Sequence, residues 1–312
     1  MSVGSETPAL VITGLHKSFG ANRAVAGLDL FVSTGEIVGM IGPDGAGKTT
    51  TMRTALGLLT PDSGTVMLWG QDGEKRTRKT KERLGYMPQR FSLYPDLTVA
   101  ENLRFFSELY LVPLSERGQR EAEMLEFSRL GKFRDRKAGA LSGGMKQKLA
   151  LSCNLVHRPE LLILDEPTTG VDPVSRQEFW EGLRRFAGEG LAILVSTPYM
   201  DEAELCDRVL LVHQGRVLAQ GTPGELTSLF PGGFLSVSAT DAAQLSPVLA
   251  SAGLASDSVV RFGDSWHLAY PEGQGENVGR LLDAAGLAWE RITPGIEDVF
   301  VSLVSQAGEV IS

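Results

Sequence analysis

The segment GPDGAGKTT, residues 42–50, decides the fold of this chain. It follows EIVGMI, an apolar run typical of a buried strand, and precedes TMRTALGLL, which has the spacing of a helix. The residues match the pattern Gly42-x-x-x-x-Gly47-Lys48-Thr49, in which the glycines let the backbone curl so that amide N–H groups converge on an anion. A strand, a glycine-rich loop and a helix in this order predict a phosphate-binding loop in an α/β protein.

The residue types of this loop fit that chemistry. The helix beginning near Lys48 points its positive end at the phosphates, the Lys48 ammonium adds charge for the β- and γ-phosphates, and the Thr49 hydroxyl suits Mg²⁺. A glycine-rich turn could match the pattern by chance, but here the strand and the helix stand in the confirming places. The candidate nucleotide-binding residues of the loop are Gly42, Pro43, Asp44, Gly45, Ala46, Gly47, Lys48, Thr49 and Thr50.

A second motif places two acids at the end of an apolar run. In LLILDEP, Asp165 and Glu166 follow four apolar residues, at the edge where open α/β sheets bind ligands. Asp165 is expected to hold Mg²⁺ and Glu166 to act as the general base for an attacking water. Taken alone, the motif could equally be an acidic turn that Pro167 closes.

Composition narrows the class of protein. The 312 residues, 42% of them hydrophobic, suffice for one large core and a smaller second domain. Apolar runs such as LLIL and LAILV fall far short of the roughly 20 residues that span a bilayer, and we see no secretory signal. Cys153 and Cys206 suit reduced thiols of the cytoplasm, and the net charge of −8 argues against a nucleic-acid partner.

The hydrophobic pattern divides the chain. Strand-like runs fill it to about residue 85, helical spacing follows from about 97 to 150, and strands LLILD and LAILV then alternate with helices. This order predicts a doubly wound α/β domain over residues 1–228, with a helical subdomain at about 86–150. In residues 229–312 the order βαββαβ predicts a small ferredoxin-like accessory domain.

The residues between the two motifs point to a family. LSGGMKQKLAL, which begins at Leu141 and stands ahead of LLILDEP, resembles the signature sequence of ATP-binding cassette (ABC) transporter ATPases. Gln89 in YMPQR matches the glutamine of that family's Q-loop, Phe19 in KSFG resembles the aromatic residue that stacks on adenine, and Asp172 in TTGVD matches the D-loop aspartate. The resemblance covers about residues 9 to 225 and predicts the P-loop ABC cassette fold, with a RecA-like core and an antiparallel β arm.

The resemblance also implies a site and partners. It implies ATP with Mg²⁺ held by Thr49, Gln89 and Asp165, with Gln89 assisting Glu166 in catalysis. It implies a head-to-tail dimer in which the signature of one cassette closes over ATP in a second cassette; the signature residues are Ser142, Gly143 and Gly144. A serine and glycine amides at the start of MKQKLAL form an anion site by themselves, and they would equally serve as an ordinary helix N-cap.

Two further stretches resemble one branch of the family. FSLYPDLTVAENLRFF is similar to efflux cassettes that pair with separate membrane subunits, and GIEDVFVSLV is similar to the C-terminal extension of the drug-export branch. In the family, the Q-loop surface receives a helix of the membrane subunit, so Phe91 and Tyr94 could contact it or belong to the domain core. We therefore expect a cassette at the cytoplasmic face of a membrane.

The chain departs from its family at STPYMDEAE, residues 196–204. The family has a histidine, the H-loop switch, where this sequence has Pro198, and proline has neither a side-chain donor nor a backbone N–H. The proline could simply be a rigid turn between a strand and a helix. The alternative is a cassette that binds Mg-ATP and dimerises, but hydrolyses poorly at its own site and works in an asymmetric pair.

Two other classes of function remain open from the sequence. One is a soluble ABC ATPase acting on ribosomes or DNA, which would be expected to carry two cassettes or a long coiled-coil insertion that this sequence lacks. The other is a non-enzymatic nucleotide-binding regulator, which Pro198 keeps possible. The membrane-coupled efflux ATPase is the preferred reading, and its transported substrate is not encoded in this chain.

Overall fold

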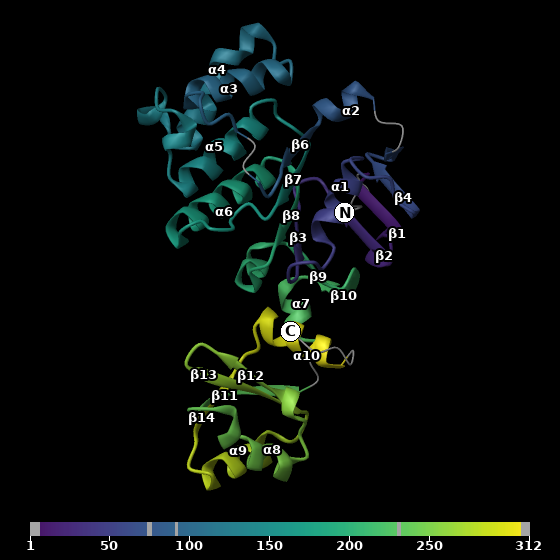
Figure 1. The fold of residues 1–312 in the computed structure, drawn as a ribbon, viewed down its shortest axis with the longest axis vertical. Helices are drawn as coiled ribbons and strands as arrows, with labels where there is room; N and C mark the ends of the chain where they lie inside the picture. The colour runs from purple at the N-terminus through teal and green to yellow at the C-terminus, as the bar shows by residue number, and fades with distance from the viewer. Residues whose placement is uncertain (1–6, 74–76, 91–92, 230–231, 307–312) are drawn as a thin grey trace, which may run out of the picture. The chain divides into compact units, whose positions relative to one another are not determined.

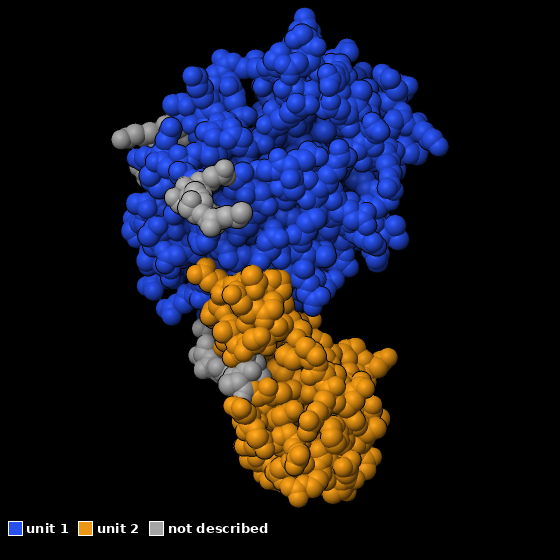
Figure 2. All heavy atoms as spheres, turned by 180° about the vertical axis from the view of Figure 1, so that it is seen from behind, with its two compact units in different colours: residues 1–217 blue, residues 218–312 orange. Residues whose placement is uncertain are grey.

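The computed structural model describes residues 7–73, 77–90, 93–229 and 232–306. The chain forms two compact units, residues 1–217 and 218–312, which Figure 2 shows in different colours. The division between the units falls ahead of the boundary after residue 228 that the sequence pattern favours. Each unit has its own sheet and its own core, and each is described separately below.

A six-stranded sheet forms the centre of unit 1, in the order β10-β9-β3-β8-β7-β6, and the division after residue 217 falls within its edge strand β10. The pairs of β3 with β8 and β9, and of β7 with β6 and β8, are parallel. Every residue of β3 and β7 is buried, as expected for strands with helices on both faces. The strands are β3 (Ile37–Ile41), β6 (Leu84–Met87), β7 (Leu161–Asp165), β8 (Ala192–Thr197), β9 (Arg208–His213) and β10 (Arg216–Gly221).

An antiparallel sheet, the predicted β arm, covers one side of this core in the order β2-β1-β4-β5. Helix α1 (Lys48–Ala55) belongs to the apolar cluster that joins the two sheets, and its Met52 and Ala55 are fully buried. In Figure 1, α1 lies on one side of the central strands, and α5 (Gly143–Leu155) and α6 (Pro173–Gly188) lie on the other. The arm strands are β1 (Leu10–Phe19), β2 (Asn22–Val32), β4 (Ser63–Leu68) and β5 (Gln71–Asp72).

The predicted helical subdomain forms from α3 (Val99–Leu109), α4 (Leu114–Phe127) and α5 (Gly143–Leu155). Its first helix begins where the sequence supplies a capping box, because Thr98 accepts from the Glu101 N–H and the Glu101 carboxylate accepts from the Thr98 N–H. Short helical turns connect the larger helices and the sheet: α2 (Arg78–Glu82), η2 (Gly131–Phe133) and η3 (Ala138–Ala140).

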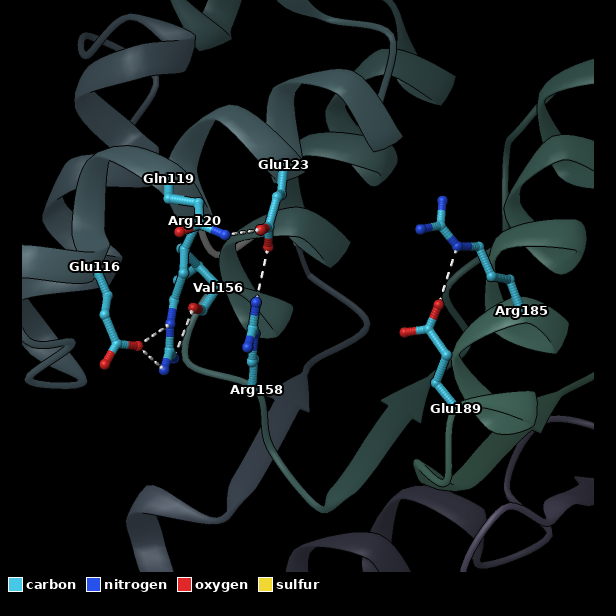
Figure 3. A network of polar contacts seen from close by, with 8 residues as sticks. All are labelled: Glu116, Gln119, Arg120, Glu123, Val156, Arg158, Arg185 and Glu189. Carbon is cyan, nitrogen blue, oxygen red and sulfur yellow. Dashed lines mark hydrogen bonds and ion pairs between the residues drawn. The ribbon is translucent and has the colours of Figure 1, made fainter.

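Hydrogen bonds of charged residues connect α4 to the turn that follows α5 (Figure 3). Arg158 donates to the Glu123 carboxylate at 3.0 Å, and Arg120 reaches the Val156 carbonyl oxygen at 3.5 Å. Arg158, Arg185 and Glu189 line a groove, and on the side opposite Arg158, Arg185 of α6 donates to Glu189, the residue just after this helix. The polar contacts drawn in this view lie within each side of the groove. The two sides are joined by apolar packing between α4 and α6 and by ion pairs of Glu178, in α6, with Arg129 and Lys148.

Helix α6 (Pro173–Gly188) connects the acidic motif to β8 and supplies that packing. Gly182 leaves room for the Phe127 ring, since a Cβ at this position would lie 2.7 Å from Phe127 Cζ. The same ring packs edge to face on Phe186 at 4.9 Å between centroids. After β8, the acidic segment predicted to be helical forms the 3-10 helix η4 (Met200–Leu205).

Unit 2 has the predicted ferredoxin-like fold. Its four strands pair antiparallel in the order β12-β13-β11-β14, and α8 and α9 share a core with the sheet that includes Leu235, Leu268 and Leu282. A final helix, α10, has Val299 and Val304 fully or almost fully buried. The elements are α7 (Pro223–Thr227), β11 (Gly232–Ser238), η5 (Ala242–Gln244), α8 (Ser246–Ala252), η6 (Ser256–Ser258), β12 (Val259–Phe262), β13 (Ser265–Pro271), α9 (Gly275–Ala284), β14 (Ala288–Ile292) and α10 (Ile296–Gln306).

No helix in the described parts of the chain is both long enough and apolar enough to cross a bilayer. Cys153 and Cys206 are buried and not joined in a disulfide, and burial raises the pKa of both thiols. Both thiols are therefore protonated core groups at neutral pH.

Candidate nucleotide-binding site

The phosphate-loop residues connect the end of β3 to the start of α1. Gly45 and Gly47 have φ of +78° and +98°, which glycine adopts without strain. Space also requires glycine, since a Cβ at Gly47 would lie 2.3 Å from the Ala24 carbonyl oxygen and one at Gly42 would lie 2.0 Å from that of Val212. The neighbouring backbone thus requires glycine at positions 42 and 47. The first amide N–H groups of α1 remain available to bind an anion.

Lys48 is buried at the bottom of this loop, with 3% of its surface exposed. Its ammonium donates to the carbonyl oxygens of Gly42 at 2.6 Å and Pro43 at 2.9 Å, and lies 3.4 Å from Oε1 of Glu166. These contacts hold the positive charge between the loop and the acidic motif. The position suits an ammonium that binds phosphate oxygens.

Asp165, at the carboxyl end of β7, fits a Mg²⁺ ligand. Its Oδ1 accepts hydrogen bonds from Thr49 Oγ1 at 3.0 Å and Ser196 Oγ at 2.9 Å. The residue is fully buried, yet its Oδ2 has no hydrogen-bond partner among the described residues. An unsatisfied buried carboxylate oxygen beside a threonine hydroxyl matches the oxygen donors that Mg²⁺ takes together with phosphates and water.

Glu166 is held by contacts on both carboxylate oxygens. Gln89 Nε2 donates to its Oε2 at 2.7 Å, while Oε1 faces Lys48. Its own backbone has φ +49°, an uncommon value for a residue with a side chain, and its N–H donates to Ser196 Oγ at 3.1 Å. Gln89 therefore lies at the predicted general base, and the described contacts link it to that base rather than to Asp165.

Ser196 is a site residue that the sequence reading missed. Its hydroxyl donates to Asp165 and accepts from the backbone of Glu166, so it connects the two acids. The available signal was that Ser196 directly follows LAILV, in the strand that pairs with LLILD. Recognising its role requires knowing that these strands are neighbours in register.

A cavity of about 210 Å³ lies over the phosphate loop. Phe19, which the resemblance assigns to adenine stacking, lines it with 50% of its surface exposed. The other lining residues are Asn22, Ala24, Gly45, Ala46, Gly47, Lys48, Thr49, Thr50 and Glu166. An exposed aromatic ring at one end and a buried ammonium at the other match a ligand with a flat base and a charged tail.

The signature and D-loop residues occupy the ends of two adjoining helices. Ser142 caps α5 by accepting from the Met145 N–H at 3.4 Å, and Asp172 caps α6 by accepting from the Ser175 N–H at 2.9 Å. These hydrogen bonds from Ser175 lower the pKa of the Asp172 carboxyl group.

The two caps pack closely, because a Cβ at Gly144 would lie 2.3 Å from Ser175 Oγ. Ser142 and Gly143 are exposed at this helix end. Within the described residues, no hydrogen bond or ion pair joins the signature, Ser142–Gly144, to the phosphate loop of the same chain. The first amides of α5 thus remain available to an anion from outside the chain.

Pro198 follows β8 directly. Next to it, Thr197 Oγ1 accepts the Tyr199 N–H at 3.0 Å and so stabilises the turn. His157 belongs to the helical subdomain, where its ring stacks on Tyr110 at 3.7 Å and its Nε2 contacts the Leu84 carbonyl oxygen. Of the Q-loop aromatics, Phe91 lies outside the described residues, and Tyr94 is 46% exposed.

Comparison with known proteins agrees with this geometry. A family model described as "ABC transporter" matches residues 25–169. The probable multidrug ABC transporter ATP-binding protein YbhF of Escherichia coli (strain K12) is 43% identical over 96% of this chain and 52% of its own length. The Nod factor export ATP-binding protein I of Burkholderia thailandensis is 37% identical over 94% of this chain and 95% of its own.

Solved structures give the same result. The structure of an ATP-binding subunit of an ABC transporter superposes with a TM-score of 0.65 at 30% identity, over 71% of this chain and 93% of that one. CbiO1 of Clostridium perfringens, part of the transporter complex cbiONQ, superposes at 0.66 with 28% identity, over 72% and 92%. The chain belongs to the family of ABC transporter ATP-binding cassettes. It spans about half the length of the multidrug relative that it matches.

Proposed function

We propose that this chain is the ATP-binding subunit of an export transporter, which couples Mg-ATP binding and hydrolysis to transport by separate membrane subunits. The proposal rests on one observation. At one end of the central sheet, beside the phosphate loop, the structure brings together four side chains: Lys48, Thr49, Asp165 and Glu166. The export assignment rests on the relatives, whose names describe multidrug transport and Nod factor export.

In the proposed reaction each residue has one role. Lys48 binds the β- and γ-phosphate oxygens, and Thr49 and Asp165 hold Mg²⁺, which neutralises phosphate charge when it is bound. Glu166 accepts a proton from the attacking water. Gln89, which donates to Glu166 Oε2, orients that carboxylate and the water, and it lies near enough to the acidic motif to follow movements of the Q-loop.

The signature is proposed to act on a partner. Ser142 and the Gly143 amide are exposed at the start of α5 and would bind the γ-phosphate held by a second cassette, in a head-to-tail pair. Pro198 leaves this chain's own site without the family's histidine donor, and losing one such donor commonly lowers a rate by about 10²–10³. Both statements support an asymmetric pair. We propose that this pair lies at the cytoplasmic face of the membrane, as the peripheral partner of the membrane subunits.

The test of the nucleotide site is Mg-ATP binding by calorimetry to the purified chain. Lys48→Ala should weaken binding strongly, because the phosphates would then face backbone donors alone. Lys79→Ala, on the exposed helix α2, is the matched control and should bind as the unchanged chain does. Equal affinity in both variants would remove the site assignment.

Co-purification from native membranes distinguishes the proposed function from its alternatives. Recovery of integral membrane subunits supports the transporter, and recovery of ribosomes or nucleic acid supports a soluble ABC ATPase instead. A regulator that binds nucleotide without hydrolysis remains the second candidate, because Pro198 stands at the switch position. Steady ATP turnover by the co-purified complex with the partner's site disabled, abolished by Lys48→Ala, would exclude it.

A further inference from the structure

Glu202 is a buried carboxylate in the segment that follows Pro198. The 3-10 helix η4 carries three acids, of which Asp201 and Glu204 are exposed while Glu202 is only 1% exposed. Burying a carboxylate costs free energy unless hydrogen bonds and a counter-charge compensate for the lost water. The contacts of Glu202 therefore show which interactions compensate for the burial of its carboxylate.

Those contacts reach two other segments. Thr168 Oγ1 donates to Glu202 Oε2 at 3.0 Å inside the protein. On the other side, Arg176 Nη1 lies 3.9 Å from Glu202 Oε1, 3.5 Å from Asp201, and its guanidinium carbon is 5.1 Å from the Tyr199 ring centroid. One arginine thus contacts three residues of the segment after Pro198, and Thr168 anchors the middle one.

The segments joined in this way are parts of the candidate site. Thr168 stands two residues after Glu166, and its carbonyl oxygen accepts the Val171 N–H, so it belongs to the turn between the general base and the D-loop. Arg176 stands one helical turn after Asp172, whose carbonyl oxygen accepts its N–H at 2.9 Å. Glu202 hence lies where the general-base turn, the D-loop helix and the segment of Pro198 meet.

We propose that Glu202 is a positioning residue, which with Thr168 and Arg176 sets the register between the Pro198 segment and the turn that carries Glu166. The inference rests on the proposed function. Stability alone is a poor reason for the cluster, because apolar residues of similar volume commonly stabilise a protein as well as a buried ion pair or better. What the charged cluster adds is a defined geometry that apolar packing would not impose.

A second consequence concerns the partner cassette. Asp172 lies at the exposed start of α6 and belongs to the surface that the proposed dimer would cover. A shift of this helix end on dimerisation would move Arg176, and through Glu202 it would move the segment of Pro198. The cluster is in this way the route by which cassette pairing reaches the site of this chain.

The test uses the co-purified transporter complex with four variants of this chain. Thr168→Val removes the hydroxyl at nearly constant volume, Thr168→Ser keeps it, and Glu202→Gln removes the charge. Glu204→Gln, on the exposed side of the same 3-10 helix, is the matched control. Three quantities are measured for each, in complexes whose partner cassette has its own site disabled: kcat for ATP at the site of this chain, the dissociation constant for Mg-ATP, and the thermal midpoint.

A positioning role predicts a fall in kcat of about ten-fold or more in Thr168→Val and Glu202→Gln, with the Mg-ATP affinity unchanged. A fifth variant, which combines Thr168→Val with Glu202→Gln, should lose less than the sum of the two single losses, because both changes weaken the same cluster. Thr168→Ser and Glu204→Gln should keep the original kcat. An unchanged kcat in Thr168→Val overturns the inference, and so does a loss shared equally by Thr168→Ser.

Failure of the proposed function gives a different result. In that case the unaltered complex shows no ATP turnover sensitive to Lys48→Ala, or the unaltered chain does not bind Mg-ATP. If Glu202→Gln lowers the thermal midpoint so far that the complex does not assemble, the two threonine variants alone decide the question. The kcat of Thr168→Ser then has to be about ten-fold or more above that of Thr168→Val for the positioning role to stand.

Discussion

Gln89 donates a hydrogen bond of 2.7 Å to Glu166, although the two residues lie 77 positions apart in the chain. The bond joins the segment after β6 to the acid after β7, two parallel neighbours whose carboxyl ends meet at one edge of the sheet. Lys48, 3.4 Å away, holds the other oxygen of the same carboxylate. These two contacts fix the orientation of the side chain of the proposed general base.

Replacing this base should separate binding from hydrolysis. We expect Glu166→Gln to keep Mg-ATP binding, because Lys48, Thr49 and Asp165 stay in place, and to lower single-turnover hydrolysis by about 10²–10⁴-fold. Rapid quench of the co-purified complex with the partner's site disabled measures the rate at this chain's site, and Glu126→Gln on the exposed face of α4 is the control. Hydrolysis at the original rate would show that Glu166 is not the base.

A bulky residue in the signature should harm the partner's site. Ser142→Phe is expected to lower turnover at the second cassette more than at this chain's own site. Ser142 is exposed, and among the described residues its side chain bonds to the Met145 N–H rather than to the phosphate loop. The change also removes a helix N-cap, which costs about 1 kcal/mol. Thr98→Ala removes the cap of α3 and controls for that loss. Turnover is measured with one cassette altered at a time, and the reverse asymmetry would contradict the head-to-tail pairing.

Restoring a histidine at the switch should raise activity at this chain's site. Pro198→His adds a γ-phosphate donor beside Glu166, and single-turnover hydrolysis with the partner site disabled should increase, by up to about 10²–10³-fold. The gain can be smaller, since the turn closed by Thr197 and Tyr199 formed around proline. A variant that folds and binds ATP without any increase would mean that Pro198 serves only as a turn residue.

The two glycines of α6 should respond oppositely to alanine. Gly188→Ala meets no atom within 4 Å and should stabilise the chain by about 0.5–1 kcal/mol through helix propensity. Gly182→Ala places a Cβ 2.7 Å from the Phe127 ring, which is itself packed on Phe186, so we expect a loss of about 1–3 kcal/mol. Urea unfolding of both variants measures the difference in the free energy of unfolding. Equal stabilities would show that the Phe127 ring of α4 moves aside without a cost in free energy.

His157 should make the chain less stable in acid. Burial lowers its pKa from 6.5 to about 4, so the unfolded chain binds a proton between these pH values and the folded chain does not. The free energy of unfolding should therefore fall from pH 6.5 to pH 4, with a contribution from this residue of about 3 kcal/mol. His157→Phe keeps a ring on Tyr110 and should flatten this part of the pH profile. An identical slope in His157→Phe would refute the assignment.

Several features were readable from the sequence alone, because their causes are local. A glycine-rich loop needs neighbours that form a strand and a helix, and the spacing around residues 42–50 supplies both. Capping residues bond to amides three positions away, so the sequence allowed Ser142 as a helix N-cap, and the structure has it at the start of α5. The apolar runs of β7 and β8 have no polar alternation, which predicts burial on both faces.

The tertiary structure decided the contacts between distant segments. Ser196 joins Asp165 to Glu166 only because β8 pairs with β7 in one particular register, and a slip of one residue would turn its hydroxyl to the other face. Of the acids in η4, the fold buries Glu202 because Thr168 and Arg176 lie where its carboxylate arrives. Sequence periodicity reports which face a residue takes, whereas its partners depend on strand order and helix packing, which bring together residues dozens of positions apart.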